Sequence, residues 1–134
     1  MKAQVVIERG TDGSFDATME YLAEVPFGLL GQGATVAETI ADFRNSYREM
    51  CEMYEAEGKA CPELEFVFKY DVPSFLQYYA YAFTLAGLER ITGVNQKQLG
   101  HYIAGVRKPS EKTARKIEES IRCFAKDLEA VRFV

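Results

Sequence analysis

Amide, imidazole and cationic side chains are concentrated in the sequence GVNQKQLGHYIAGVRKPS, which covers residues 93–110. A helix over this stretch would present Gln96, Lys97 and His101 on an outward face. Gln can bond adenine through two hydrogen bonds and Lys can reach guanine acceptors, so this face predicts contacts with base edges in DNA. Phosphate contacts would come from the start of the helix and from the cations that follow it, namely Asn95, Arg107, Lys108 and Lys112.

The charge around this stretch differs from that of the whole chain, whose formal net charge is −4. Residues 1–70 hold 6 Lys or Arg and 13 Asp or Glu, whereas residues 71–134 hold 10 and 7. Between Arg90 and Lys116, seven basic residues stand against a single acid, Glu111. Opposite charge on the two halves predicts two different partners, although two solvated surfaces would give the same bias.

Helix signals fill the second half of the chain. Gly93 and Gly105 suit C-cap positions, and Asn95 with Gln98 has the spacing of a capping box. Gly100 lies inside a helix, where Gly costs about 1 kcal/mol relative to Ala. The terminal VRFV could form a strand. We expect helices over residues 73–83, 84–93, 95–105 and 110–131, the last with one apolar face made of Ile117, Ile121, Phe124, Leu128 and Val131.

This half also carries the pattern of a known DNA-binding motif. LERITGVNQKQLGHYIAGVRKPSEKTARKIEESI resembles the Xre/Cro-type helix-turn-helix, in which Leu, Gly-Val-Ser/Thr-Gln and an aliphatic residue precede Gly, a basic pair and Pro-Ser. The resemblance implies that the helix after the turn enters the major groove. One position departs from the pattern, because Glu89 stands where the family has a small Ala. The matching residues are Leu88, Gly93, Val94, Gln96, Leu99, Gly105, Arg107, Lys108, Pro109 and Ser110.

Strand signals dominate the start of the chain. AQVVIER is rich in β-branched residues, and the residues from Phe15 to Tyr21 alternate between apolar and polar. The turn sequence TDG lies between these two segments, so together they predict a hairpin. A short third strand is expected from about Leu29 to Gln32, and ELEFVFKY predicts a last strand with Leu64, Phe66 and Phe68 on one face and Val67 on the other.

A single long helix is expected between the third and the last strand. Thr35 and Glu38 have the capping-box spacing, and the helix should end near Gly58. Its buried face would hold Val36, Ile40, Phe43, Tyr47, Met50 and Tyr54. These elements predict an α+β fold, a small antiparallel sheet covered by one helix, followed by the all-α half.

Residues 1–70 contain no His, so neither a Ser/His/Asp nor a Cys/His catalytic set is possible in this half, and its carboxylates are the remaining candidates. Glu8, Asp12, Asp16, Glu20 and Glu24 could hold two metal ions for nuclease chemistry. Asp16 and Glu20 alternate with the apolar strand residues, however, which favours a solvated surface. GLLGQG lacks the Lys and Ser/Thr of a phosphate loop, and His101 has no second His or Cys nearby in the sequence. We therefore predict no catalytic, metal or cofactor site.

The three cysteines, Cys51, Cys61 and Cys123, are odd in number and have no CxxC spacing. This pattern predicts reduced, mostly buried thiols in a cytoplasmic protein. The first residues, MKAQVVIERG, soon become charged, and no long apolar run follows. The sequence therefore predicts neither a signal peptide nor a membrane span.

Taken together, the order strand, strand, Gly-rich segment, long helix, strand and helix-turn-helix resembles the HicB antitoxin family. Pro26, Gly31, Gly33, Thr35 and Glu38 stand in the family's order. The resemblance implies two domains. Residues 1–70 would form a partial ribonuclease-H-like domain that blocks a small basic HicA-like ribonuclease toxin. Residues 71–134 would form a helix-turn-helix domain that represses the operon by binding double-stranded operator DNA.

Inverted-repeat operators demand a two-fold protein, so we also expect a homodimer or a higher homo-oligomer, formed through the sheet or through the terminal helix and VRFV. Two other hypotheses stay open at this point. One is a stand-alone helix-turn-helix regulator whose sheet domain senses a ligand or dimerises. The other is a nuclease on a ribonuclease-H-like scaffold.

Overall fold

The computed structural model describes residues 1–134, which divide into two compact units, Met1–Tyr78 and Tyr79–Val134. The sequence placed this division between residues 70 and 71. The first unit extends further because the short helix α2 (Val72–Tyr78) packs against its strands and its long helix. The Asp71 carboxylate caps α2 by accepting from Ser74 N at 2.9 Å, and it also accepts from Arg9 N at 2.9 Å. Asp71 thereby ties α2 to the first strand.

The first unit has four strands, β1 (Lys2–Arg9), β2 (Phe15–Met19), β3 (Leu30–Gly33) and β4 (Glu65–Tyr70), in the spatial order β3-β2-β1-β4. The α+β class is as predicted. The sheet is mixed rather than antiparallel, since β4 pairs parallel with β1 while the other two pairings are antiparallel. A helical crossover from β3 to β4 brings the chain back in the direction of β1, which a parallel pairing requires.

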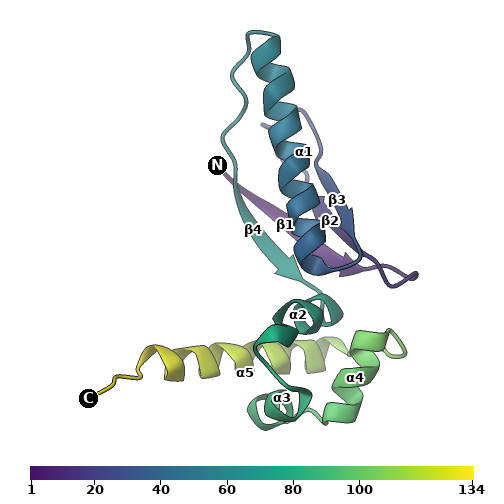
Figure 1. Cartoon of the computed structure of the whole chain (residues 1–134), viewed down its shortest axis with the longest axis vertical. Coiled ribbons are helices and arrows are strands. Elements are labelled where there is room, and N and C mark those ends of the chain that lie inside the picture. Colours follow the sequence, from purple (N-terminus) through teal and green to yellow (C-terminus); the bar gives the residue numbers. More distant parts are fainter. The chain divides into compact units, whose positions relative to one another are not determined.

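Helix α1 (Val36–Ala56) lies along one face of this sheet (Figure 1). Its start follows the predicted cap, because Thr35 Oγ1 accepts from Glu38 N at 3.1 Å. The predicted apolar face packs on the sheet: Val36 and Phe43 are fully buried, and Ile40, Tyr47 and Met50 are partly buried against the same core.

Gly31 brings β3 close to α1. A Cβ atom at this position would lie 2.6 Å from both Phe43 N and Thr39 O, which are backbone atoms of α1. Only glycine permits this approach. Strand β2 ends at Met19, so Tyr21, which the alternation placed with the buried residues, is instead 88 % exposed.

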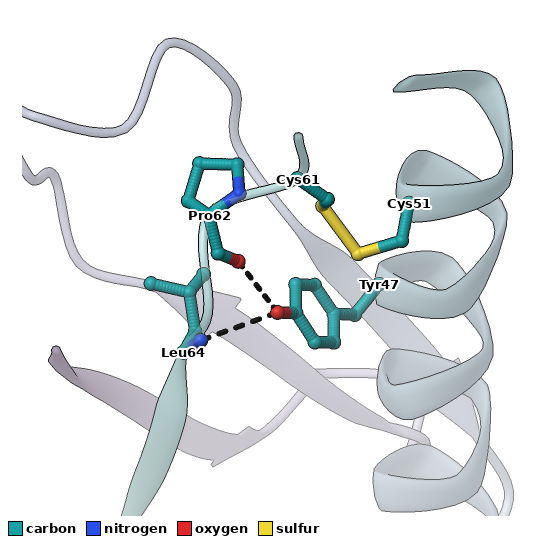
Figure 2. Close-up of a disulfide and its surroundings, with 5 residues drawn as sticks. All are labelled: Tyr47, Cys51, Cys61, Pro62 and Leu64. Carbon is teal, nitrogen blue, oxygen red and sulfur yellow. Dashed lines mark hydrogen bonds between the residues drawn. A yellow bond between two sulfur atoms is a disulfide. The ribbon is translucent and has the colours of Figure 1, made fainter. Parts of the chain in front are cut away.

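Cys51 and Cys61 form a disulfide, which corrects the prediction of reduced, buried thiols. The bond joins the last part of α1 to the segment before β4, and the Cα atoms are 5.1 Å apart (Figure 2). Tyr47 holds the same segment, since its hydroxyl donates to Pro62 O at 2.6 Å and accepts from Leu64 N at 3.2 Å. The third cysteine, Cys123, is free and exposed.

The second unit is helical. A 3₁₀ turn (Tyr79–Tyr81) precedes α3 (Leu85–Thr92), α4 (Gln96–Ala104) and α5 (Glu111–Glu129). No strand forms at the end of the chain, because Val131–Val134 has no pairing partner or regular structure. None of the helices has the length and apolar character needed to cross a membrane.

Candidate nucleic-acid interface

The turn between α3 and α4 is fixed by local hydrogen bonds. Thr92 Oγ1 donates to Leu88 O at 2.7 Å and accepts from Val94 N at 3.1 Å. Gly93 has φ 73°, the left-handed conformation that glycine adopts without strain, and it ends α3 as the sequence predicted. Because Thr92 is itself buried, the hydrogen bonds that fix the turn lie in the interior of the unit.

Helix α4 is anchored through one side. Leu99 and Tyr102 are buried, as is Val94 just before the helix. Gln98 Nε2 donates to Tyr102 Oη at 2.6 Å, so this amide is engaged within the chain. The side of α4 that carries Lys97 faces outward.

The predicted base-reading residues lie on this outward surface. Lys97 is exposed and His101 is half-buried, and the two are neighbours one helical turn apart. Gln96 is exposed at the first residue of α4, on the side next to α3. The structure thus brings Lys97 and His101 together and sets Gln96 beside them at the start of the helix.

The amide groups at the start of α4 are occupied. Gln96 N donates to Glu89 Oε1 at 3.1 Å, and Lys97 N donates to Asn95 Oδ1 at 2.8 Å. These two groups are therefore not free to bind phosphate. The sequence had predicted phosphate contacts from the start of this helix, and these two amides do not provide them. Asn95 can still donate through its side-chain NH₂ group, because its carbonyl oxygen makes the cap.

Glu89 is the residue whose role sequence reasoning missed. It departs from the Xre/Cro-type pattern, and the structure explains the departure, since its carboxylate reaches from α3 across the turn to cap α4. The sequence signal for this role is an acid four residues before the C-cap Gly93, on a helix followed closely by another. A negative charge is favourable at a helix N-terminus.

Cations surround the start of α4 and of α5. All seven basic residues between Arg90 and Lys116 are exposed, and an ion pair is present only at Arg115, whose guanidinium lies 3.4 Å from Glu111. Lys116 lies against the α3–α4 turn, with its Nζ 3.3 Å from where a Cβ on Gly93 would stand. The predicted phosphate ligands are the exposed residues Asn95, Arg107, Lys108 and Lys112.

Arg107 and Lys108 belong to the loop between two well-formed caps. Gly105 ends α4 with φ 76°, and Ser110 Oγ begins α5 by accepting from Thr113 N at 3.1 Å. The caps fix both ends of a short loop, which limits how far its two cations can move. Two exposed cations on a short loop beside the helix start form a surface suited to the DNA backbone.

The sheet face that α1 does not cover carries more acids than bases, since Glu8, Asp16 and Glu65 lie on it together with Lys2 and Lys69. Glu8 and Asp16 are directly opposite each other in the β1–β2 register, an arrangement of like charges that destabilises a sheet. Together with Glu20 they border a hollow that also includes Val6, Thr18 and Met19. In the strand register, Leu30 of β3 pairs with Thr18 of β2, which pairs with Val6 of β1. Leu30 is 63 % exposed.

The carboxylates of this face do not form a metal site. No group of three or more His, Cys, Asp or Glu side chains lies close enough together to hold a metal ion. Asp12 lies in the hairpin turn and accepts from Ser14 Oγ at 2.6 Å and from Ser14 N at 3.0 Å. These hydrogen bonds, the one from the hydroxyl foremost, lower the pKa of Asp12.

Comparison of the chain with protein-family models, with curated proteins and with solved structures finds no match. Geometry and charge are therefore what a functional proposal has to rest on.

Proposed function

We propose that this chain is a HicB-type antitoxin that represses its own operon. Its helical unit would bind operator DNA, and its sheet unit would neutralise a small basic HicA-like toxin. One observation carries the proposal: a helix-turn-helix with a fixed turn places exposed Gln96 and Lys97 among cations that have almost no ion-pair partners. An isolated cation cluster of this kind repels itself, and a polyanion neutralises it.

DNA suits this surface better than another polyanion because two types of side chain are combined. Arg107, Lys108 and Lys112 are exposed point charges for phosphates, which provide affinity and register. Lys97 and Gln96 have donors that fit purine edges, which provides sequence preference. Glu89 occupies the first amide of α4, so the helix start does not act as a general phosphate site. The contacts with the DNA backbone are then made by the flanking cations.

The DNA half of the proposal is tested by titrating the full-length chain with the DNA upstream of its own gene. Arg107→Ala should weaken binding to every sequence and reduce the slope of log affinity against log salt by about 0.9. Lys97→Ala should lose about 1–3 kcal/mol of discrimination at one base pair. Lys126→Ala is the matched control, because this exposed lysine of α5 lies outside the cation cluster. Equal behaviour of all three variants would refute the recognition-helix assignment.

The open sheet face supports the second half of the proposal. Glu8 and Asp16 face each other and Glu20 adds to the same hollow, while the cations of this face, Lys2 and Lys69, lie in other rows of the strand register. A folded chain tolerates such repulsion at a cost, and a cationic partner would relieve it. The exposed Leu30 adds apolar area at one end of this face.

This half is tested with the product of the neighbouring reading frame. A small basic protein encoded there should co-purify with the full-length chain. Asp16→Asn should weaken the complex, yet leave the fold as stable or more stable, because it removes one of two opposed carboxylates. Glu55→Gln is the control, since it removes the same charge from an exposed position on α1.

The outcomes also separate the two other hypotheses. DNA binding without any basic partner would indicate a stand-alone regulator. Metal-dependent cleavage of nucleic acid that is lost in Asp16→Asn and Glu20→Gln would indicate a nuclease.

A further inference from the structure

The disulfide between Cys51 and Cys61 lies outside the buried core of the first unit. The bond joins the last part of α1 to the segment before β4, and neither cysteine belongs to the core cluster. Both cysteines are half-buried rather than enclosed, so a small thiol can approach the bond. Disulfides within reach of external thiols are the ones that exchange readily.

The two segments that the bond joins are also held together without it. Tyr47 lies one helical turn before Cys51, and its hydroxyl bonds both Pro62 O and Leu64 N, as Figure 2 shows. The Tyr47 ring packs edge to face on Phe66 of β4, with ring centroids 5.1 Å apart. Reduction of the disulfide would therefore leave this segment beside α1 and leave the unit folded.

Hydrogen bonds just after the disulfide connect it to the beginning of the β1–β4 pair. Glu65 N donates to Met1 O at 2.9 Å, and the N-terminal ammonium donates to Glu63 O at 3.4 Å. Lys2 and Glu65 then form the first row of the strand register. Hydrogen bonds at the end of a sheet open more easily than those in its middle. Loss of the nearby covalent tether should thus loosen the beginning of β4.

We propose that the Cys51–Cys61 bond is a redox switch that controls the order of residues 57–65 while the rest of the unit stays folded. With the bond closed, Cys61 cannot move away from α1. With the bond open, the hydroxyl of Tyr47 is the tether that remains, so the segment opens often and returns. Its return brings the two thiols back together, which allows the bond to form again.

The chemistry is thiol–disulfide exchange with a small thiol of the glutathione class. A thiolate of the reductant attacks one protein sulfur, which breaks the Cys51–Cys61 bond and forms a mixed disulfide, and the other protein sulfur leaves and takes up a proton. A second thiolate attacks the reductant's sulfur in the mixed disulfide. This step releases the small disulfide and the second protein sulfur, which is protonated in turn. Two electrons pass from two small thiols to the protein, and the small disulfide reverses the reaction.

The switch reaches the surface that would meet the toxin, a consequence that rests on the proposed function. Lys2 and Glu65 lie on the sheet face that α1 does not cover. When their row loosens, this end of the face loses its fixed shape. The reduced chain should therefore bind the basic partner more weakly than the oxidised chain.

Amide hydrogen exchange of the full-length chain tests the switch without any partner. Cys123→Ser serves as background, because this exposed thiol would otherwise react as well. Reduced glutathione should accelerate exchange of the Leu64 and Glu65 amides about 10- to 100-fold, since they then open locally instead of with the whole unit. The helical amides of Leu88 and Leu99 in the second unit are the internal control and should not change.

Oxidised glutathione should restore slow exchange at both positions. The double variant Cys51→Ser with Cys61→Ser should exchange like the reduced chain and should not respond to glutathione. Equal exchange in the two redox states, or loss of the far-ultraviolet circular dichroism of the first unit on reduction, would overturn the proposal.

Tyr47→Phe separates the two tethers, with the Glu65 amide as the readout. In the oxidised chain this variant should leave the Glu65 amide slow, because the disulfide still holds the segment. In the reduced chain it should accelerate exchange further, because both tethers are then lost. An equal effect of Tyr47→Phe in the two redox states would contradict a shared control of this segment.

Titration with the basic protein from the neighbouring reading frame separates this inference from the proposed function. Equal affinity of the oxidised chain and of the double serine variant would refute the regulation inferred here and leave the proposed function intact. Exchange that responds to glutathione in a chain that binds no such protein would refute only the proposed function.

Discussion

Gly100, the glycine inside α4, offers a direct test of the candidate interface. Glycine at this position has two explanations, which are a close approach of the helix backbone to DNA and a close approach to another part of the protein. A Cβ added at Gly100 would have Leu85 Cδ1 as its nearest neighbour, at 3.7 Å, which is ordinary van der Waals contact. The methyl group of an alanine would therefore fit, and it would point toward α3.

The magnitude follows from helix propensity. Replacing Gly by Ala inside a helix gains about 0.8–1.0 kcal/mol, and the new contact with Leu85 adds to this. Gly100→Ala should thus raise the free energy of unfolding by about 1 kcal/mol. For a small domain this corresponds to a rise in melting temperature of roughly 4–8 °C. Affinity for operator DNA should stay within about twofold, because the methyl group points toward Leu85.

The assay is thermal and urea unfolding of the full-length chain, followed by far-ultraviolet circular dichroism, alongside a DNA titration. Gly105→Ala serves as the matched control, since Gly105 has φ 76° and an L-residue there costs about 1–2 kcal/mol. The two substitutions should change stability in opposite directions. Lower stability of Gly100→Ala would refute the packing argument. Higher stability with a tenfold loss of DNA affinity would show that the glycine serves close approach to DNA.

Three further predictions concern the first unit. Cys51→Ser opens the disulfide, whose sequence separation is 10, and should lower the free energy of unfolding by about 2.7 kcal/mol; addition of reductant to the wild type should have the same effect. Gly31→Ala should cost about 3 kcal/mol because its Cβ meets backbone atoms of α1 at 2.6 Å, whereas Gly28→Ala, with nothing within 4 Å, should be neutral in urea unfolding. Ser14→Ala should raise the pKa of Asp12 toward 3.8 in an NMR titration. The stability that this carboxylate provides is full above its unfolded-state pKa and is lost as pH falls through the lower folded-state value.

Features with local causes could be predicted from the sequence. Gly93 and Gly105 end their helices in the left-handed conformation, and Thr35 caps α1, because capping depends on residues within one turn. The buried face of α1 followed from its 3.6-residue period for the same reason. The outward position of Lys97 also followed from period and capping, so part of the candidate interface was accessible to this reasoning.

Features with non-local causes could not be predicted. Cys51 meets Cys61 only because α1 and the segment before β4 run back along each other, and their spacing in the sequence carries no sign of it. The parallel pairing of β4 depends on the path of the whole crossover. Tyr21 continued the alternation of β2, but the strand had already ended at Met19. The alternation of apolar and polar residues does not by itself reveal where strand pairing ends.

Glu89 and Gly100 are the two residues of the helix-turn-helix whose types are unexpected at their positions, and the structure gives a different explanation for each. Glu89 departs from the Xre/Cro-type pattern, yet its carboxylate accepts from the first amide of α4, an interaction that stabilises the start of that helix. The same charge lies at the base of the surface that would meet DNA, where it opposes phosphate. Gly100 has no such compensation, because alanine fits. A rule broken without gain to the fold is expected at functional or neutral positions, and the DNA titration of Gly100→Ala decides between these two.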